Sequence, residues 1–183
     1  MEAVSGPLTT VEPVSPAAVA EHNLDDYAFV VVADAGTLGD AESEDLREHV
    51  AGGGALFIAL GQRSGGLDVV PITGHEFGGA TQFGASSDTF TIVGSMDDSH
   101  PAMAGTEELR IAKFFRYTSL ALQDGDQVLA ELEDGAPLLI DHALGDGRVM
   151  LFASSLDRAW NDLPVMPVFV PLIDGVTAYL SGE

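Results

Sequence analysis

A short polar segment near the carboxyl end of the chain contains the residue types best suited to recognise a ligand. It follows Val149–Ala153, five consecutive apolar residues that predict a strand buried on both faces. An arginine, two carboxylates and an indole can together hold a small polar ligand or a loop of a protein partner. The candidate binding residues of this segment are Asp157, Arg158, Trp160, Asn161 and Asp162.

Two other predicted strands also end in polar residues. Asp34 follows the apolar run 27–33, and Gln62 and Arg63 follow the apolar run 55–60. In open α/β sheets, ligands bind outside the carboxyl ends of the strands. We therefore include these three residues among the candidates for ligand or partner binding.

The segment 157–162 also has a structural interpretation, which we favour. Asp162 is suited to cap a helix that begins near Pro164. Asp157 can pair with the neighbouring arginine or accept backbone N–H groups, and Trp160 can cover the core. The sequence leaves both roles open.

Serine catalysis is a second functional hypothesis. A hydroxyl nucleophile needs a base within hydrogen-bond reach, about 3.2 Å. None of the serines that follow the predicted strands lies in the G-x-S-x-G pattern that exposes a nucleophile, and serines at strand ends more often serve turns and caps. The residues of this hypothesis are the serines Ser64, Ser154 and Ser155 and the histidines His75, His100 and His142.

Five histidines raise the question of a metal site. His75–Glu76 and Asp97–His100 contain ligand types, but no His-x-x-x-His or similar chelating pair is present. The loop acids could form a weak calcium or magnesium site, and solvated loops are the simpler interpretation. The glycine-rich turn 61–66 lacks a following Gly-Lys-Ser/Thr, so it does not predict nucleotide binding. We predict no metal and no cofactor.

The composition excludes several classes of partner. The net charge is −22, with 7 Lys and Arg against 29 Asp and Glu, which repels nucleic acids and anionic membranes. This acidity fits either adaptation to high salt or an ordinary acidic bacterial domain. The absence of cysteine excludes disulfides, thiolate metal sites and a cysteine nucleophile. No apolar run approaches the ~20 residues that span a bilayer and no signal peptide is recognisable, so we expect a soluble chain without direct membrane insertion.

The order of the predicted elements indicates one α/β domain over residues 1–183. A strand at 27–33, a helix at 40–50 with Asp40 as its N-cap, and a strand at 55–60 form a βαβ unit. Turn signals at Asp134–Gly135 and Gly145–Gly147 predict an antiparallel extension beside the parallel core. The remaining predictions are an edge strand at 8–14, a short helix at 16–21, strands at 89–93, within 109–122, at 127–132, at 137–142 and at 149–153, and a helix at 165–180. Together they predict a doubly wound, mostly parallel sheet with helices on both faces.

The segment 154–172 resembles a known family. It is similar to the carboxy-terminal soluble domain of bacterial membrane proteins that have an aerotolerance-regulator (BatA-like) amino-terminal region. Further matching segments are Leu24–Tyr27, Ala51–Gly54, His100–Pro101 and Phe114–Tyr117. The resemblance implies a class I glutamine amidotransferase-like, flavodoxin-like fold, a neighbouring von Willebrand factor A-like module, and no established catalytic activity. The family's transmembrane helices are missing here, so the chain corresponds either to the soluble part of a membrane-anchored bacterial protein or to a stand-alone relative.

The resemblance also bears on catalysis. The amidotransferase fold carries a cysteine on a sharp strand-to-helix turn, which corresponds to Gly61–Ser64 here. Because the chain has no cysteine, it cannot hydrolyse glutamine through a thioester. We predict a non-catalytic domain that acts as a protein-interaction or small-ligand-sensing module, with a serine-dependent hydrolase of small esters as the alternative. A salt-adapted structural domain without a ligand is the third hypothesis.

Overall fold

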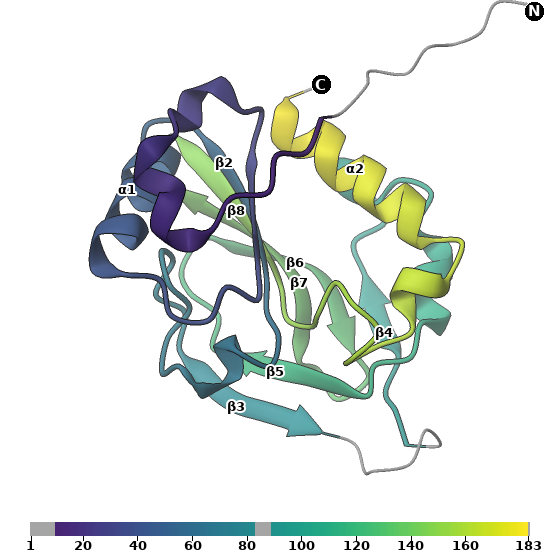
Figure 1. Cartoon of the computed structure of the whole chain (residues 1–183). Coiled ribbons are helices and arrows are strands. Elements are labelled where there is room, and N and C mark those ends of the chain that lie inside the picture. The colour runs from purple at the N-terminus through teal and green to yellow at the C-terminus, as the bar shows by residue number, and fades with distance from the viewer. Residues whose placement is uncertain (1–9, 83–88, 183) are drawn as a thin grey trace, which may run out of the picture.

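A computed structural model describes residues 10–82 and 89–182 (Figure 1). The strands are β1 (Val30–Ala33), β2 (Ala55–Ala59), β3 (Phe77–Gln82), β4 (Val93–Met96), β5 (Arg116–Leu120), β6 (Asp126–Leu132), β7 (Pro137–Leu144) and β8 (Gly147–Phe152). The α-helices are α1 (Asp40–Ala51) and α2 (Phe169–Ser181). Short 3-10 helices are η1 (Pro16–Glu21), η2 (Leu24–Asp26), η3 (Ser64–Gly66), η4 (Pro101–Met103), η5 (Glu107–Ile111) and η6 (Leu163–Val165).

The main sheet has six strands in the order β1-β2-β8-β7-β6-β4. The strands β1, β2 and β8 pair in parallel, and β8, β7, β6 and β4 pair antiparallel. The strands β1, β2, β6 and β8 consequently run in one direction and β4 and β7 in the other. The predicted βαβ unit and antiparallel extension are therefore confirmed, within an α/β sheet most of whose strands run the same way.

Helices cover both faces of this sheet, as Figure 1 shows for α1 and α2. Alternate residues of a strand point to opposite faces. In β2, Leu56 and Ile58 pack in the core that includes Leu46 of α1, whereas Phe57 packs in the core that includes Val176 of α2. The sheet is thus the middle of three layers, with a buried hydrophobic core on each of its faces.

A second, two-stranded sheet pairs β3 with β5. The sequence analysis did not predict β3, because Gly78 and Gly79 weaken its strand pattern. Gly79 has a φ of +91°, and the register between β3 and β5 shifts between Phe77 and Ala80.

Several predicted boundaries are wrong. Residues 10–14 form no strand, and the start of the predicted edge strand 8–14 lies outside the described residues. In the region 89–93, Thr91 forms only an isolated bridge to Phe114, and β4 begins at Val93. The predicted buried strand 27–33 is shorter and lies at the edge of the sheet, where Val31 is 49% exposed.

The carboxy-terminal helix also begins later than predicted, at Phe169. Pro167 disfavours a helical conformation for the residue before it, and Met166 is extended with a ψ of 146°. Asp162 therefore precedes only η6, and its side chain forms no capping hydrogen bond there. Gly39, not Asp40, occupies the N-cap of α1.

None of the helices within residues 10–82 and 89–182 has the length and apolar character needed to cross a bilayer.

Candidate functional site

The segment 157–162 is fastened to the rest of the domain by its own polar groups. Asp157 Oδ1 accepts hydrogen bonds from the Ser155 hydroxyl at 2.8 Å and from the Ala159 N–H at 2.9 Å. The buried Asn161 amide donates to Ser154 Oγ at 3.0 Å and to the Ser155 carbonyl at 2.7 Å. These contacts fix the turn after β8. They give Asp157 the structural role expected as one alternative, and they give Asn161 a structural role that was not predicted.

Two further candidates of this segment, Trp160 and Asp162, are also engaged. Trp160 is 2% exposed, and its carbonyl accepts the N–H groups of Phe115 and Arg116 at 2.7 and 3.0 Å. Asp162 Oδ1 accepts the Lys113 N–H at 2.7 Å. Asp162 therefore does not cap a helix as predicted, and its side chain instead accepts a hydrogen bond from the segment before β5.

Asp34 organises the turn after β2. Its Oδ1 accepts the N–H of Arg63 at 2.9 Å, and the N–H and hydroxyl of Ser64 at 3.0 and 3.1 Å. Asp34 has a φ of +46°, and a Cβ atom built on Gly61 would lie 2.4 Å from the Asp34 Cγ. Only glycine at position 61 permits this close approach of the β1 and β2 ends.

The exposed part of the candidate site lies on the carboxyl edge shared by β2 and β8. These strands pair in parallel, and Gln62, Arg63, Asp157 and Arg158 follow their ends with exposed side chains. The turn after β2 lies against the other segment, since a Cβ atom built on Gly65 would be 3.9 Å from the Trp160 ring. The structure therefore brings the two predicted groups of residues to one edge.

Two arginines on this edge are exceptional among the basic residues. All seven Lys and Arg side chains lie in the described residues. Five of them contact a carboxylate or an aromatic ring: Arg47, Arg110, Lys113, Arg116 and Arg148. The guanidinium groups of Arg63 and Arg158 form no hydrogen bond, ion pair or ring contact with the described part of the chain.

A small apolar hollow lies beneath the turn after β2. Its lining includes Val32, Ile58, Ser64, Pro71 and Ile72, and it has room for about one water molecule. A larger ligand would therefore not fit inside this hollow.

The three candidate serines form hydrogen bonds elsewhere. The Ser64 hydroxyl contacts Asp34 and the Gly61 carbonyl, Ser154 donates to the Arg116 carbonyl, and Ser155 donates to Asp157. Across residues 10–82 and 89–182, no hydrogen bond joins any of these serines to a histidine. The described geometry contains no serine–histidine pair poised for nucleophilic attack.

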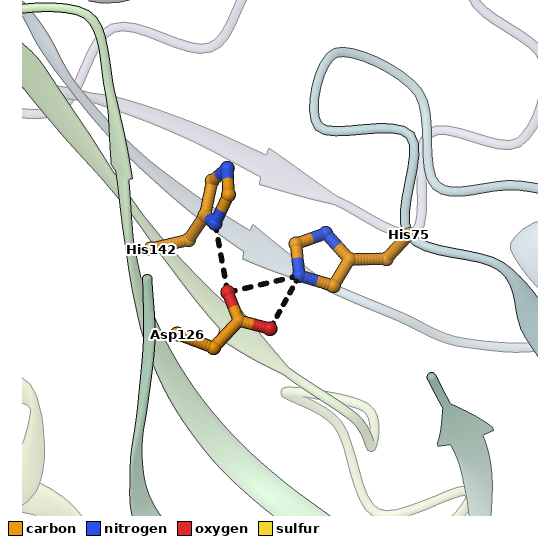
Figure 2. Close-up of side chains that lie close together, drawn as sticks. All are labelled: His75, Asp126 and His142. Atoms are coloured by element: carbon orange, nitrogen blue, oxygen red, sulfur yellow. Dashed lines mark hydrogen bonds and ion pairs between the residues drawn. The ribbon is translucent and has the colours of Figure 1, made fainter. Parts of the chain in front are cut away.

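The three candidate histidines instead contact aspartates, and Figure 2 shows the group formed by His75, Asp126 and His142. The Asp126 carboxylate contacts His142 Nδ1 at 2.7 Å and His75 Nε2 at 3.0 Å. The side chains of His75, Asp126 and His142 are 0%, 1% and 7% exposed. We call these three residues the His75 cluster; their potential ligand atoms all lie within 4.8 Å of one another.

Additional hydrogen bonds complete the His75 cluster. The Gln123 N–H donates to Asp126 Oδ2 at 2.7 Å, and Thr73 Oγ1 lies 2.9 Å from His75 Nδ1. Burial would raise the pKa of Asp126, but the hydrogen bonds from Gln123 and the two imidazoles outweigh burial and hold the pKa below its ordinary value. Burial lowers the pKa of His75 although Asp126 opposes this change. At neutral pH the cluster thus combines a carboxylate with a neutral His75.

A second group, the His100 cluster, consists of His100, Asp141, Arg148 and Tyr179. The Tyr179 hydroxyl donates to Asp141 Oδ2 at 2.6 Å, while Arg148 Nη1 and His100 Nε2 lie 3.6 and 3.8 Å from that oxygen. Burial raises the pKa of Asp141 against the opposing charge of Arg148. Burial also lowers the pKa of His100, against the attraction of Asp141. His100 thus contacts a carboxylate rather than a candidate serine.

The ligand types of the His75 cluster are far apart in the chain, so no short metal-binding motif predicts the cluster. His75 and Asp126 are 51 positions apart, and Asp126 and His142 are 16 apart. One signal was present, because Asp126 and His142 are equidistant from Asp134 in the predicted hairpin turn. That symmetry places the two residues opposite each other in an antiparallel pair, as the register of β6 and β7 confirms.

Comparison with known proteins defines the class of fold only. No known family model matches the chain, and no curated protein matches its sequence. Among solved structures, Cytoplasmic Protein STM3548 from Salmonella typhimurium is similar with a TM-score of 0.71 and 16% identity, over 88% of this chain and 74% of that one. Cytoplasmic Protein STM1381 from Salmonella typhimurium LT2 is similar with a TM-score of 0.61 and 17% identity, over 92% of this chain and 76% of that one. A β-galactosidase from Bacillus circulans sp. alkalophilus gives 0.63 and 16%, over 88% of this chain but 24% of the enzyme.

These similarities identify an α/β domain with a helix-covered sheet. The chain matches most of two cytoplasmic proteins and about a quarter of a much longer glycosidase. At such low identity the comparisons support a statement about the fold but none about the activity.

Proposed function

We propose that this chain is a non-catalytic, amidotransferase-like domain that acts as a protein-interaction or small-ligand-sensing module. The observation that carries this proposal is the pair of arginines, Arg63 and Arg158, whose guanidinium groups have no partner among the described residues. Both follow strands that pair in parallel, so both belong to the carboxyl edge where open α/β sheets bind ligands.

The charge of the protein strengthens the argument. In a chain with 29 Asp and Glu and a net charge of −22, carboxylates that could pair with an exposed arginine are abundant. Within residues 10–82 and 89–182, five of the seven basic residues contact a carboxylate or a ring, and these two do not. Guanidinium groups bind carboxylates and phosphates through two parallel hydrogen bonds. The occupant we infer is therefore a small polar ligand, or a loop of a protein partner, that carries such an anionic group.

The local structure also favours binding over catalysis. The turn after β2, where amidotransferases carry their nucleophile, has Ser64 as its only hydroxyl. That hydroxyl is buried and hydrogen-bonded to Asp34 and Gly61. The resemblance of 154–172 to BatA-like proteins supports the same proposal, because it implies a domain without established catalytic activity.

A binding test uses an Arg63→Ala/Arg158→Ala double variant. Thermal-shift screening of small carboxylates and phosphates, followed by calorimetry, should find a ligand that binds the parent and not the double variant. Arg47→Ala is the matched control, because Arg47 is a half-exposed arginine on α1 that pairs with Glu44. Trp160→Ala is not a suitable probe, since removal of a ring that is 2% exposed would unfold the domain.

A protein partner is tested with a photo-crosslinking residue in place of the exposed Gln62. In the cells that produce the protein, a discrete adduct should form with the parent, persist in the Arg47→Ala protein and disappear in the double variant. Failure of both the ligand screen and the crosslinking experiment would contradict the proposal.

The hydrolase alternative requires a separate test. The parent and the Ser64→Ala, Ser154→Ala and Ser155→Ala variants are assayed with short-acyl nitrophenyl esters at low and high salt. We expect no turnover above the background of the variants. Turnover that one folded serine variant abolishes would replace the binding proposal with catalysis.

A further inference from the structure

We propose that the His75 cluster is a binding site for a divalent transition-metal ion, with Zn²⁺ as the expected ion. His75 Nε2, His142 Nδ1 and the Asp126 carboxylate would be its ligands. This inference concerns a different part of the molecule from the arginines and does not depend on the proposed function. His142 pairs with Val149 near the start of β8, whereas Arg158 follows the end of that strand.

Backbone pairing holds two of the ligands in place. Asp126 and His142 are directly opposite each other in the antiparallel pair of β6 and β7. Side chains opposite each other on one face of such a pair have Cβ atoms about 4.5–5.5 Å apart. The approach of a carboxylate to an imidazole therefore follows from the sheet register and does not require the cluster to be flexible.

The third ligand comes from a loop with an unusual backbone. His75 closes the loop 70–76, where its carbonyl accepts the Val70 N–H at 2.8 Å. Ile72 in this loop has a φ of +76°, a strained conformation for a β-branched residue. The surrounding contacts maintain this strain, and the result is an imidazole directed at the β6–β7 pair, as Figure 2 shows.

The donor set suits zinc. Two imidazole nitrogens and a carboxylate match the three-ligand sites that bind Zn²⁺, in which a further position remains for water or another donor. With bonds of 2.0–2.1 Å, neighbouring ligand atoms around a tetrahedral ion are about 3.3 Å apart. Asp126 Oδ1 lies 2.7 Å from His142 Nδ1 and 3.2 Å from His75 Nε2, so these contacts need to lengthen by only a few tenths of an ångström. The two imidazole nitrogens lie within 4.8 Å of each other and would have to approach by up to about 1.5 Å.

A second layer of hydrogen bonds is already in place. Thr73 Oγ1 contacts His75 Nδ1 and would accept a hydrogen bond from Nδ1–H when Nε2 binds a metal. The Gln123 N–H donates to the Asp126 carboxylate, and the Gln123 amide also donates to the Thr73 carbonyl at 3.3 Å. Such outer contacts fix the orientation and tautomer of metal ligands.

The position of the site suggests its role. The ion would join the loop 70–76 to the β6–β7 pair at a nearly solvent-free point. Because the ligands are buried, the ion would serve as a structural clip instead of a centre that turns over a substrate. Binding to the folded state alone raises the stability of the folded state.

Calorimetry with ZnCl₂ on the full chain, after treatment with a chelator, tests the proposal. We expect one equivalent to bind with a dissociation constant of ~1 µM or tighter. Asp126→Asn and His142→Gln should weaken binding on the order of 100-fold or more, and Thr73→Val about 10-fold. His100→Gln is the matched control, since it alters a buried histidine beside an aspartate in the other cluster.

Two further measurements keep the proposal testable if a ligand variant does not fold. The parent saturated with Co²⁺ should give the intense visible absorption of a tetrahedral complex, and Zn²⁺ should slow amide hydrogen exchange in 70–76. Weak binding of several ions that Asp126→Asn and His100→Gln reduce equally would identify the acidic surface as the site and overturn the proposal. Absence of both the cobalt spectrum and the slowed exchange in the parent would overturn it as well.

Discussion

Two histidine–aspartate clusters lie on opposite faces of the same strand and differ in how their carboxylates are satisfied. Asp141 and His142 are neighbours in β7, and their side chains point to opposite faces. In the His75 cluster, the Asp126 carboxylate has hydrogen-bond donors at both oxygens. In the His100 cluster, Asp141 Oδ1 is buried and has no hydrogen-bond partner in the described part of the chain.

The comparison shows that burial alone does not set the charge of a buried acid. Burial raises the pKa of both carboxyls, yet the pKa of Asp126 ends below its ordinary value and that of Asp141 above it. The difference lies in the groups that donate hydrogen bonds directly to each carboxylate. Asp126 has three such donors. Asp141 has one close hydroxyl, that of Tyr179, and the basic groups of Arg148 and His100 lie 3.6 and 3.8 Å away. Direct hydrogen bonds to a carboxylate can outweigh its desolvation, whereas longer charge contacts here do not.

Asp126→Asn should have the largest effect on this comparison. The amide places a donor where Asp126 now accepts from His75, His142 or the Gln123 N–H, and it leaves a buried group unsatisfied. We expect the metal-free protein to lose about 3 kcal/mol of unfolding free energy, measured by urea denaturation. A loss below about 1 kcal/mol would mean that the His75 cluster is no better satisfied than the His100 cluster.

The pH dependence of stability should have opposite signs at the two acids. Asp126, with its lowered pKa, stabilises the fold above about pH 3.9, and this contribution is lost as the pH falls through its folded pKa. Asp141, with its raised pKa, contributes stability below about pH 3.9 that is lost as the pH rises through its folded pKa. The parent should therefore be more stable than Asp126→Asn at neutral pH and lose this difference in unfolding free energy as the pH falls. Relative to Asp141→Asn, the parent should lose stability as the pH rises. Urea denaturation across this pH range measures the difference in unfolding free energy between the parent and each variant. If both differences changed with pH in the same direction, the opposite pKa shifts assigned to Asp126 and Asp141 would be contradicted.

Thr73→Val should have an intermediate effect. It removes the hydroxyl 2.9 Å from His75 Nδ1 in a buried position and leaves the ring nitrogen without its partner. We expect a loss of about 1–2 kcal/mol in urea denaturation of the metal-free protein. Thr91→Val is the control, because Thr91 is equally buried and its hydroxyl makes only a long 3.5 Å contact. Equal losses in the two variants would remove the special role of Thr73.

Asp141→Asn should be nearly neutral. The amide oxygen can accept from the Tyr179 hydroxyl, and the variant removes a carboxylate whose charged form burial disfavours. At pH 7 we expect a change of less than about 1 kcal/mol in either direction. A loss as large as that of Asp126→Asn would show that Arg148 and His100 stabilise the carboxylate more than their distances indicate.

Arg63→Ala and Arg158→Ala should have the smallest effect on stability. Their exposed guanidinium groups form no hydrogen bond or ion pair with the described residues. We expect each change to alter the unfolding free energy by less than about 0.5 kcal/mol. A larger loss would reveal a structural role for that arginine, and binding data on its variant would then require correction for folding.

Local pattern was sufficient for much of the fold. The apolar run before Gly61 and the turn at Asp134–Gly135 located strands because both depend on neighbours in the sequence. Prediction failed where the deciding contacts are distant. The sequence around Thr91 is typical of a strand, but Thr91 forms only an isolated bridge to Phe114. The strand β3 forms through its pairing with β5, which lies far from it in the sequence.

The sequence by itself determined which chemistry the protein cannot perform and which residues are available for binding. The absence of cysteine excludes a thioester mechanism, and the polar ends of the predicted strands identified Arg63 and Arg158. Only the tertiary structure decided that five basic residues contact a carboxylate or a ring of the described residues while these two do not, and that His75 contacts Asp126 and His142. The physical reason is that hydrogen bonds and ion pairs depend on a few ångströms of separation. Sheet register and loop conformation set those separations between residues far apart in the chain.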